Sequence, residues 1–332
     1  MQTLNIPGTE LHPSVLALGT VPVGSTLGHS ESFALLDAYL EAGGTFIDTA
    51  RVYSDWLPGE RSSSEKMIGR WLADRKNRGR FLLATKGGHP PLDDMHHPRL
   101  SRADIRHDLE GSLHDLQTEY IDLYWLHRDA PEHPVEDIID TLDDLANAGH
   151  IRYYGASNWT AGRLVAANTY ARQAGKRPFV ANQMMWSLAA PNPAGMLDDT
   201  LVEMDAPTLA LHTRSGLSAV PYTSQANGFF SGRYERGAAL PDSPAARSVQ
   251  RLFFSDANFS RLDRVNDLAA RLGWTPTQVD LAYLRAQPFP VFPIIGPRTL
   301  EQLQDSLPAG DLTLDAASAA WLHRGAAPGS MA

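Results

Sequence analysis

The stretch from Phe81 to His127 contains one complete strand–helix–strand unit. It opens with the apolar run Phe81-Leu82-Leu83-Ala84-Thr85-Lys86 and closes with Ile121-Asp122-Leu123-Tyr124-Trp125-Leu126-His127. Short apolar runs rich in branched and aromatic residues are typical of buried parallel strands. The amphipathic stretch Ser101–Leu116 between them predicts a helix, and Ser101-Arg102-Ala103-Asp104 resembles a capping box at its start.

The same alternation of short apolar runs and longer helix-period segments continues along the whole chain. Eight strands that alternate with helices predict a (β/α)8 barrel. The predicted strands are Val15–Gly19, Thr45–Asp48, Phe81–Lys86, Ile121–His127, Arg152–Ser157, Phe179–Gln183, Leu217–Tyr222 and Val291–Gly296. The predicted helices include Ser30–Ala42, Ser63–Asp74, Ser101–Leu116, Val135–Ala148, Thr160–Ala174, Phe259–Leu272 and Thr275–Ala286, and a further helix that opens at Arg298 and Thr299 after the last strand.

A doubly wound open sheet is the competing architecture, and it would normally carry a glycine fingerprint after the first strand. The run Gly19-Thr20-Val21-Pro22-Val23-Gly24 lacks that pattern, so the barrel is preferred. Ahead of the first strand, Thr3–Ile6 and Glu10–Pro13 predict a small hairpin around Pro7-Gly8-Thr9.

We interpret residues 1–324 as one domain, because no linker or low-complexity segment interrupts them. Two long segments, Gly87–Leu100 and 224–255, predict long loops at the mouth of the barrel. The small residues of 325–332 predict a disordered tail.

Composition excludes several classes of function. The chain has 332 residues, is 43% hydrophobic and carries a formal net charge of −9. Negative charge argues against nucleic acid or an anionic membrane as a partner. The absence of cysteine excludes disulfides and thiolate catalysis. Since no Lys or Arg precedes Arg51 and no apolar run would cross a bilayer, we expect a cytoplasmic protein.

Four residues with complementary chemistry follow or end three of the predicted strands. Asp48, Lys86 and His127 occupy strand ends, and Tyr53 lies on the loop after Asp48. In an eight-stranded barrel the carboxyl ends of the strands meet at one mouth, where chemistry takes place. The sequence therefore predicts a proton-donating site made of an acid, a phenol, an amine and an imidazole.

The expected division of work starts from the phenol. A free tyrosine has a pKa near ~10 and is a poor acid at neutral pH. An ammonium beside Tyr53 would lower that pKa, and Asp48 would position Lys86. His127 would then donate a hydrogen bond to a substrate carbonyl.

The motifs around these residues resemble the aldo-keto reductase family. Phe46-Ile47-Asp48-Thr49-Ala50 with Tyr53, Thr85-Lys86 and Leu126-His127 are similar to its catalytic motif, and the resemblance extends over residues 3 to 315. Ser64-Glu65-Lys66-Met67-Ile68-Gly69 resembles the branch that includes potassium-channel β-subunits and bacterial reductases. The resemblance implies that Tyr53 is the general acid, tuned by Lys86 and Asp48, and that His127 orients the carbonyl.

The resemblance also implies a nicotinamide cofactor. Hydroxyl and amide groups of Ser157, Asn158 and Gln183 suit a carboxamide, the ring of Tyr222 suits stacking on the nicotinamide, and Arg298 suits a 2′-phosphate, which favours NADP(H). The predicted cofactor-binding residues are Gly19, Thr20, Asp48, Ser157, Asn158, Gln183, Tyr222, Thr223, Ser224, Ala226, Gly228, Arg233, Gly296, Arg298, Thr299, Gln302, Asp305 and Ser306.

This chain departs from the family pattern at two places in that set. The family usually has Ser-Pro-Leu-Gly after the tyrosine, whereas this chain has Thr223-Ser224-Gln225-Ala226. Ser306 stands where the family commonly has asparagine.

The predicted substrate-binding residues are Trp56, Arg128, Trp159 and Trp186, because aromatic walls suit apolar or sugar-ring substrates. Arg128 would meet an anionic substrate group or pair with Asp129. We expect no metal site, since the histidines and aspartates of 89–97 follow no helical or strand spacing.

The sequence thus predicts an NADP(H)-dependent reductase of aldehydes or ketones that acts on small molecules, as a monomer or homo-oligomer. Three alternatives stay open. They are a Schiff-base lyase that uses Lys86, a nicotinamide-binding regulatory subunit of a membrane protein, and a metal-assisted hydrolase.

Overall fold

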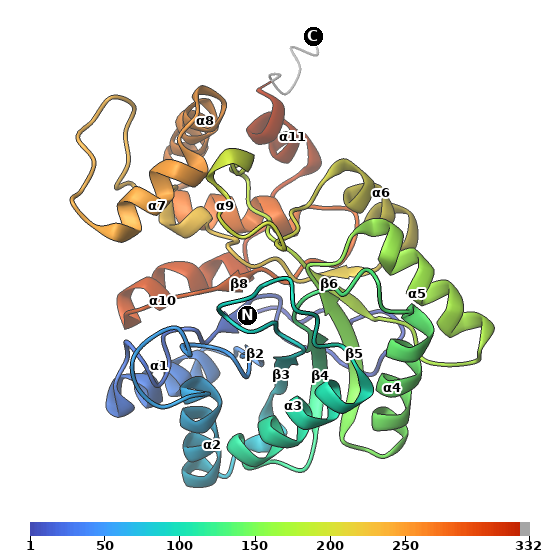
Figure 1. Ribbon diagram of the computed structural model, residues 1–332. Coiled ribbons are helices and arrows are strands. Elements are labelled where there is room, and N and C mark those ends of the chain that lie inside the picture. Colours follow the sequence, from blue (N-terminus) through green and yellow to red (C-terminus); the bar gives the residue numbers. More distant parts are fainter. Residues whose placement is uncertain (326–332) are drawn as a thin grey trace.

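Residues 1–325, which the computed structural model describes, form eight parallel strands in a curled sheet surrounded by helices (Figure 1). The sheet order is β7-β6-β5-β4-β3-β2-β1-β8. The strands are β1 (Ala17–Gly19), β2 (Phe46–Asp48), β3 (Leu82–Gly87), β4 (Ile121–Leu126), β5 (Ile151–Ser157), β6 (Ala181–Gln183), β7 (Ser218–Ala219) and β8 (Ile294–Ile295).

Backbone hydrogen bonds join the two ends of this sheet order. Strand β8 pairs with β1 through Ala17 and Ile294. On the other side, the amide of Ala219 donates to the carbonyl of Pro290 at 2.9 Å, and the amide of Phe292 donates back to Ala219 at 2.8 Å. The strands therefore form a ring, and the predicted (β/α)8 barrel is confirmed.

Helices cover the outside of the ring, and α7, α8 and α11 gather at one edge, at the top of Figure 1. The helices are α1 (His29–Glu41), α2 (Ser63–Arg75), α3 (Arg102–Asp115), α4 (Val135–Asn147), α5 (Ala161–Gln173), α6 (Ala206–Ser215), α7 (Pro244–Phe253), α8 (Asp256–Leu272), α9 (Pro276–Arg285), α10 (Leu300–Ser306) and α11 (Ala316–Arg324). Short 3-10 helices are η1 (Arg78–Arg80), η2 (Pro193–Gly195), η3 (Ala226–Gly228) and η4 (Leu307–Gly310).

Three helices, α6, α7 and α11, lie where no helix was predicted. Helix α6 has Asp205 as its N-cap, whose side chain accepts a hydrogen bond from the amide of Thr208. Helix α7 lies within the segment 224–255 that was expected to be a loop, and Ser243 caps it in the same way. Helices α6 and α7 are both short and have a proline in the first turn, which is favourable at a helix start.

Side chains of the strands fill the interior of the barrel, and the hairpin closes its amino-terminal end. The predicted hairpin is confirmed by bonds from the Leu4 amide to the Pro13 carbonyl and from the Ile6 amide to the Leu11 carbonyl, both 3.0 Å. Ile6 and Leu11 are buried in one apolar cluster with residues of the strands. The strand and loop residues of that cluster are Ala17, Phe46, Leu82, Ala84, Leu123, Trp125, Val180, Ala181, Val220, Phe292 and Ile294.

The opposite end of the barrel collects the predicted functional residues, because all strands point the same way. Asp48, Ser157 and Gln183 are the last residues of β2, β5 and β6, and Lys86 is next to last in β3. His127 directly follows β4, and its amide donates to the Gly87 carbonyl at 2.8 Å.

No helix within residues 1–325 is both long enough and apolar enough to cross a membrane. The predicted disorder of the tail concerns residues that, apart from Gly325, lie outside the described part of the chain.

Candidate active site

Lys86 brings three of the predicted catalytic residues together. Its Nζ atom lies 2.5 Å from Oδ2 of Asp48, 2.7 Å from the hydroxyl of Tyr53 and 2.8 Å from the carbonyl oxygen of Thr49. Lys86 and Asp48 are almost completely buried. The three donors of an ammonium group thus each have an acceptor, and one of those acceptors is the phenol.

The imidazole of His127 lies beside this cluster. The rings of His127 and Tyr53 meet edge to face with centroids 6.0 Å apart. Nδ1 of His127 is buried and forms no hydrogen bond with any residue between 1 and 325. The ring can therefore offer a hydrogen bond to a bound molecule.

A second imidazole, from the loop after β3, joins the site. The His89 ring lies 4.7 Å from that of His127, and its Nδ1 is 2.6 Å from the Pro90 carbonyl oxygen. Sequence reasoning placed the histidine-rich loop at the rim without selecting His89. Its spacing from His127 is set by the packing of two loops, so no sequence period marks it.

The expectation that the pKa of Tyr53 is low is wrong for the free protein. Burial raises the pKa of Tyr53 well above its usual range, and the negative charge of Asp48 raises it further. Burial also lowers the pKa of Lys86, against the opposing effect of Asp48. Because Asp48 lies against the same ammonium, the field that Tyr53 experiences is that of a nearly neutral pair. Tyr53 is therefore a protonated phenol at neutral pH, which is the form that donates a proton.

Both imidazoles are neutral at physiological pH. Burial lowers the pKa of His127 well below its usual range, and His89 and Arg128 lower it further. Burial, with help from Arg128, lowers the pKa of His89 to about 4. A neutral His127 can donate a hydrogen bond without adding a charge to the site.

A buried polar network on the outside of β3 supports Lys86 and Tyr53. The Thr85 hydroxyl donates to Oε1 of Glu65 at 2.5 Å, and Nη1 of Arg51 lies 3.4 Å from Oε2 of Glu65 and 3.0 Å from Asp115. The Arg51 amide donates to the Lys86 carbonyl at 3.1 Å. Arg51 lies on the loop that carries Tyr53, so this network ties the phenol and the amine to the same wall.

The ends of β5 and β6 place Ser157, Asn158 and Gln183 beside the cluster. Gln183 donates to Oδ1 of Asp48 at 3.1 Å. The Asn158 amide donates to the His127 carbonyl at 3.2 Å and to the Ser157 hydroxyl at 3.1 Å. Its oxygen accepts from the hydroxyl of Tyr222 at 2.6 Å and from the amide of Val202 at 3.1 Å. All the polar capacity of the Asn158 side chain is used within the protein.

The loop after β7 has a strained backbone. Thr223, Ala226 and Asn227 adopt positive φ angles of 54°, 46° and 53°, which are unusual for residues other than glycine. Ser224 fixes this loop to β8, because its hydroxyl donates to the Ile294 carbonyl at 2.6 Å. Gly228 has a φ of 82°, a backbone conformation that residues with a side chain rarely adopt, so glycine is favoured at this position.

The segment after β8 lies against the same loop. Gln225 donates to the hydroxyl of Ser306 at 3.0 Å. Thr299 caps α10 by accepting from the Gln302 amide, and the Gln302 side chain accepts from the Arg298 amide at 2.8 Å. The Arg298 guanidinium is exposed and forms no ion pair with any described residue. Gly296 and Asp305 lie in this same segment.

Gly19 and Thr20, at the end of β1, are closely packed. A Cβ atom on Gly19 would lie 2.7 Å from Cγ2 of Ile294. The Thr20 hydroxyl donates to the Asp48 carbonyl at 3.0 Å and is buried. Both residues adjoin the catalytic cluster through Asp48.

The predicted substrate-binding residues have different surroundings. Trp56 is 51% exposed and Trp186 is partly buried. Trp159 is fully buried, packs on Phe179 and donates to the Arg128 carbonyl, so its place is that of a core residue.

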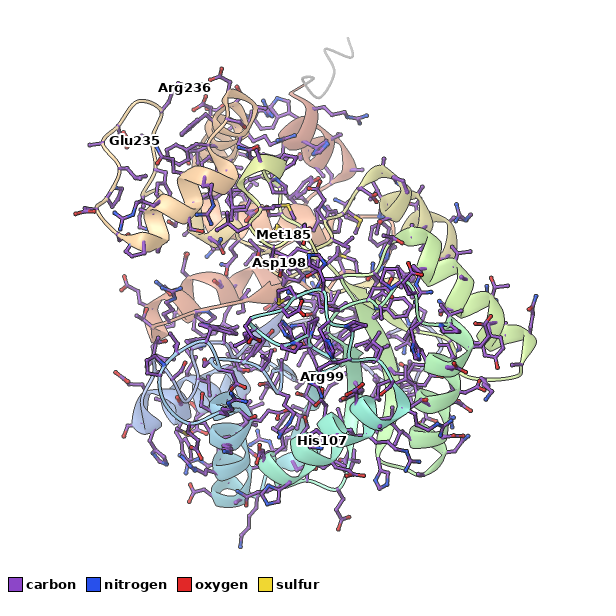
Figure 2. All side chains as sticks on the ribbon, viewed as in Figure 1. Arg99, His107, Met185, Asp198, Glu235 and Arg236 are labelled. Atoms are coloured by element: carbon purple, nitrogen blue, oxygen red, sulfur yellow. The ribbon has the colours of Figure 1, made fainter. Side chains whose placement is uncertain are left out.

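One expectation was that Arg128 pairs with Asp129, and it is wrong. The Arg128 guanidinium lies 3.0 Å from Oδ2 of Asp198, whereas Asp129 pairs with Arg163 at 3.0 Å. In the view of Figure 2, Asp198 is labelled next to Met185, while Glu235 and Arg236 lie far out on the loop before α7.

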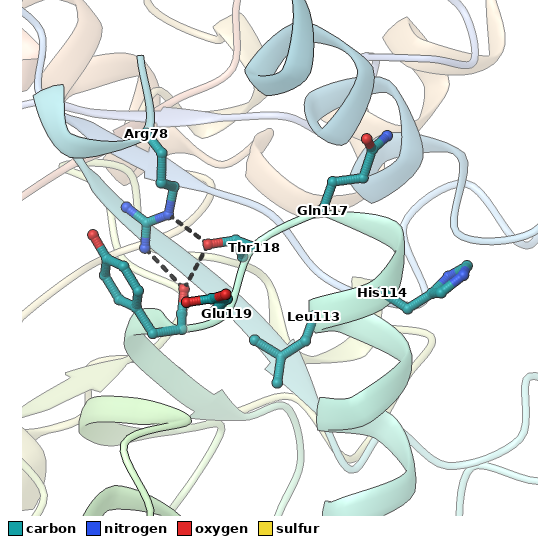
Figure 3. A pocket seen from close by; sticks show the side chains of 7 residues that line it. Arg78, Leu113, His114, Gln117, Thr118 and Glu119 are labelled. Carbon is teal, nitrogen blue, oxygen red and sulfur yellow. Dashed lines mark hydrogen bonds between the residues drawn. The ribbon is translucent and has the colours of Figure 1, made fainter. Parts of the chain in front are cut away.

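Two surface hollows lie away from this rim. One, of about 480 Å³, is lined by residues that precede β3 and β4, including Arg78, Thr118 and Tyr120, and so belongs to the amino-terminal side of the barrel (Figure 3). The other, of about 630 Å³, lies between α1 and α2. Neither includes a predicted site residue. Within residues 1–325, no three potential metal ligands among His, Asp and Glu lie close enough together to hold an ion.

Comparison with known proteins identifies one family. Residues 15–324 match the model of the Aldo/keto reductase family. An uncharacterised oxidoreductase of Bacillus subtilis, YrpG, is 32% identical over 313 residues, which cover 92% of this chain and 90% of the relative. An aryl-alcohol dehydrogenase [NADP(+)] of Phanerodontia chrysosporium is 30% identical over 93% of this chain and 81% of its own. Norsolorinic acid reductase B of Aspergillus parasiticus is 29% identical over 93% and 79%.

Proposed function

The chain belongs to the aldo/keto reductase family, and we propose that it reduces the carbonyl group of aldehydes or ketones with NADPH and oxidises the corresponding alcohols in reverse. The observation that carries this proposal is the contact between Lys86 and Tyr53, with 2.7 Å between the ammonium nitrogen and the phenol oxygen.

Each residue of the cluster has a separate task in the proposed reaction. The Tyr53 hydroxyl donates its proton to the carbonyl oxygen as negative charge develops there. Lys86 stabilises the phenolate that remains, and Asp48 holds Lys86 in place. Neutral His127 donates a hydrogen bond that orients the carbonyl.

The residues around the mouth fit a nicotinamide dinucleotide. When bound, the reduced cofactor would supply the hydride. Ser157 and Gln183 would hold the carboxamide, and Tyr222 would lie against the ring. Asn158 would join them only if Tyr222 or Val202 gave up its bond to the asparagine oxygen. The exposed guanidinium of Arg298 would pair with a 2′-phosphate, which supports NADP(H) over NAD(H).

Replacement of Tyr53 by Phe tests the proposal. We expect Tyr53→Phe to lower kcat for a carbonyl panel by about 10²- to 10⁴-fold, while NADPH affinity measured by fluorescence titration stays within twofold. Tyr170→Phe, which removes a phenol from the outer surface of α5, is the matched control. Normal turnover in the Tyr53 variant would reject this mechanism.

Replacement of Arg298 by Ala tests the cofactor assignment. We expect the variant to weaken NADPH binding by about tenfold or more and to leave NADH binding unchanged, because only NADPH has the phosphate. Arg214→Ala, on the exposed end of α6, is the control for loss of a surface charge. Equal losses for both cofactors would exclude a 2′-phosphate contact.

A Schiff-base lyase remains the second candidate from the same residues. That chemistry needs Lys86 to have a free lone pair. All three donors of its ammonium have acceptors, which favours a role in tuning Tyr53. Covalent trapping of substrate by borohydride would support the lyase instead. A regulatory subunit would bind NADPH but show negligible turnover across the carbonyl panel.

A further inference from the structure

Two ion pairs lie next to His89 and His127. Lys86 pairs with Asp48 and Arg128 pairs with Asp198. The two imidazoles between these pairs, His89 and His127, are neutral because burial lowers their pKa values. The site as a whole therefore presents almost no net charge to a bound molecule.

Of the two cations, Lys86 and Arg128, only Arg128 has an acidic partner that lies on a loop, namely Asp198. The Arg128 side chain is 9% exposed, and it donates to the His127 carbonyl at 2.9 Å and to the Thr200 hydroxyl at 2.9 Å, in addition to Asp198. Arg128 lowers the pKa values of Tyr53 and His127, so its charge is felt by both. The hydrogen bond to the His127 carbonyl places the guanidinium directly beside one of the residues that would meet a substrate carbonyl.

Asp198 is held in place as a carboxylate. Its Oδ1 atom accepts from the amide of Thr200 at 2.9 Å and from the hydroxyl of Thr200 at 2.5 Å. Burial acts to raise the pKa of Asp198, but the hydrogen bonds from Thr200 and Arg128 outweigh it and lower the pKa. At neutral pH the Arg128 guanidinium therefore always has a resident anion from its own chain.

We propose that Asp198 is a specificity-determining residue, which occupies Arg128 so that the site accepts uncharged carbonyl compounds and rejects those that carry a carboxylate. The proposal rests on the proposed function. A carboxylate on the substrate would have to leave water and meet a cation that is already paired, which is unfavourable. Without the charge of Asp198, the same substrate group would gain a charge-assisted hydrogen bond from Arg128.

Two aldehydes of almost equal shape test the proposal. The probes are 4-nitrobenzaldehyde, which is neutral, and 4-carboxybenzaldehyde, which is an anion of the same outline. We expect Asp198→Asn to lower the ratio of kcat/KM for the neutral aldehyde to kcat/KM for the anionic aldehyde by about tenfold. The change should come mainly from a lower KM for the anion, because that substrate gains one charge-assisted contact. The intrinsic reactivity of the two aldehydes cancels when this ratio is compared between wild type and variant. Asp198→Ala serves in its place if Asp198→Asn does not fold.

The adjacent residue provides the matched control. Asp199 is exposed and lies 3.3 Å from His96 rather than near Arg128. Asp199→Asn removes the same charge one residue along the chain, so the ratio should stay at the wild-type value. In the double variant Arg128→Met with Asp198→Asn, the gain for the anion should disappear.

Binding of benzoate, measured by calorimetry with NADPH present, separates this proposal from the proposed function. We expect Asp198→Asn to bind benzoate about tenfold more tightly than wild type. An unchanged substrate ratio together with unchanged benzoate affinity would overturn the role of Asp198. If benzoate binding tightens but no aldehyde is reduced by the wild type, the proposed reductase activity fails and the pairing role of Asp198 stands.

Discussion

At the scale of single residues, burial decides the protonation state of the site more than any one charge does. Tyr53 is partly buried and His127 is buried, and removal from water holds the first as a phenol and the second as a neutral imidazole. The ammonium of Lys86 lies against both Asp48 and Tyr53, so its charge is shared. These residues can be identified from the sequence. The compensation of the Lys86 charge by Asp48 cannot, because it depends on the distance between the two groups.

Asp280 is a buried acid outside the site, and its burial should make the free energy of unfolding depend on pH. One oxygen accepts from the Leu188 amide at 3.3 Å, and the other has no partner among residues 1–325. Burial raises its pKa well above the usual range. The folded state therefore holds the proton, and stability is lost as pH rises from the unfolded pKa, near ~4, through the folded one.

We expect Asp280→Asn to raise the free energy of unfolding at pH 8 by about 1 to 3 kcal/mol, since Asn has no charge to bury. The gain should shrink towards pH 4, where the wild-type acid is protonated in both states. Urea unfolding at the two pH values measures this. A gain of equal size at both would show that ionisation is not the cause.

At the scale of elements, the barrel and most of its helices could be predicted because their patterns are local. The apolar runs of β3 and β4 and the amphipathic stretch that forms α3 are each visible in the sequence. Helix α7 was missed because the segment around it reads as a loop, although Ala246, Val249 and Phe253 are buried at helical spacing. The contact between Arg128 and Asp198 joins residues 70 positions apart, and no sequence period announces such a pair.

The network that joins α2 to β3 depends on Glu65. Burial raises the pKa of this carboxyl to about 7, although the hydrogen bond from Thr85 and the charge of Arg51 act against the shift. The folded pKa is above the unfolded one, so stability falls as pH rises from about 4.5 to about 7, by a total on the order of 3 kcal/mol.

Replacement of Glu65 by Gln should remove the Glu65 part of that slope and leave the part due to Asp280, because an amide can still accept the hydrogen bond from Thr85 but has no proton to lose. Denaturant unfolding at intervals between pH 4.5 and 7 measures it. Glu60→Gln is the control in the neighbouring exposed segment, where ion pairs with Lys66 and Arg70 lower the pKa. A slope as steep as that of the wild type in the Glu65 variant would show that Glu65 does not titrate in this range.

At the scale of the whole molecule, the two ends of the barrel have different tasks. The rim formed by the carboxyl ends of the strands carries the candidate site, and the hairpin closes the opposite end. A change in the hairpin should therefore affect folding without affecting chemistry.

We expect Ile6→Ala to lower the free energy of unfolding by about 2 to 5 kcal/mol, because Ile6 is fully buried, while kcat/KM stays within twofold. Leu4→Ala, at a 39% exposed position of the same hairpin, should change stability by no more than about 0.5 kcal/mol. A loss of turnover at unchanged stability would show that the two ends of the barrel are coupled.

The pairing of β8 with β1 has a consequence for the folding of this protein during its synthesis on the ribosome. Ala17 of β1 pairs with Ile294 of β8, and these two residues are far apart in the sequence. During synthesis, one edge of β1 stays unpaired until β8 has been made. An unpaired strand edge can pair with other chains. Protection of the nascent chain by chaperones is therefore most valuable in the interval before those last strands leave the exit tunnel.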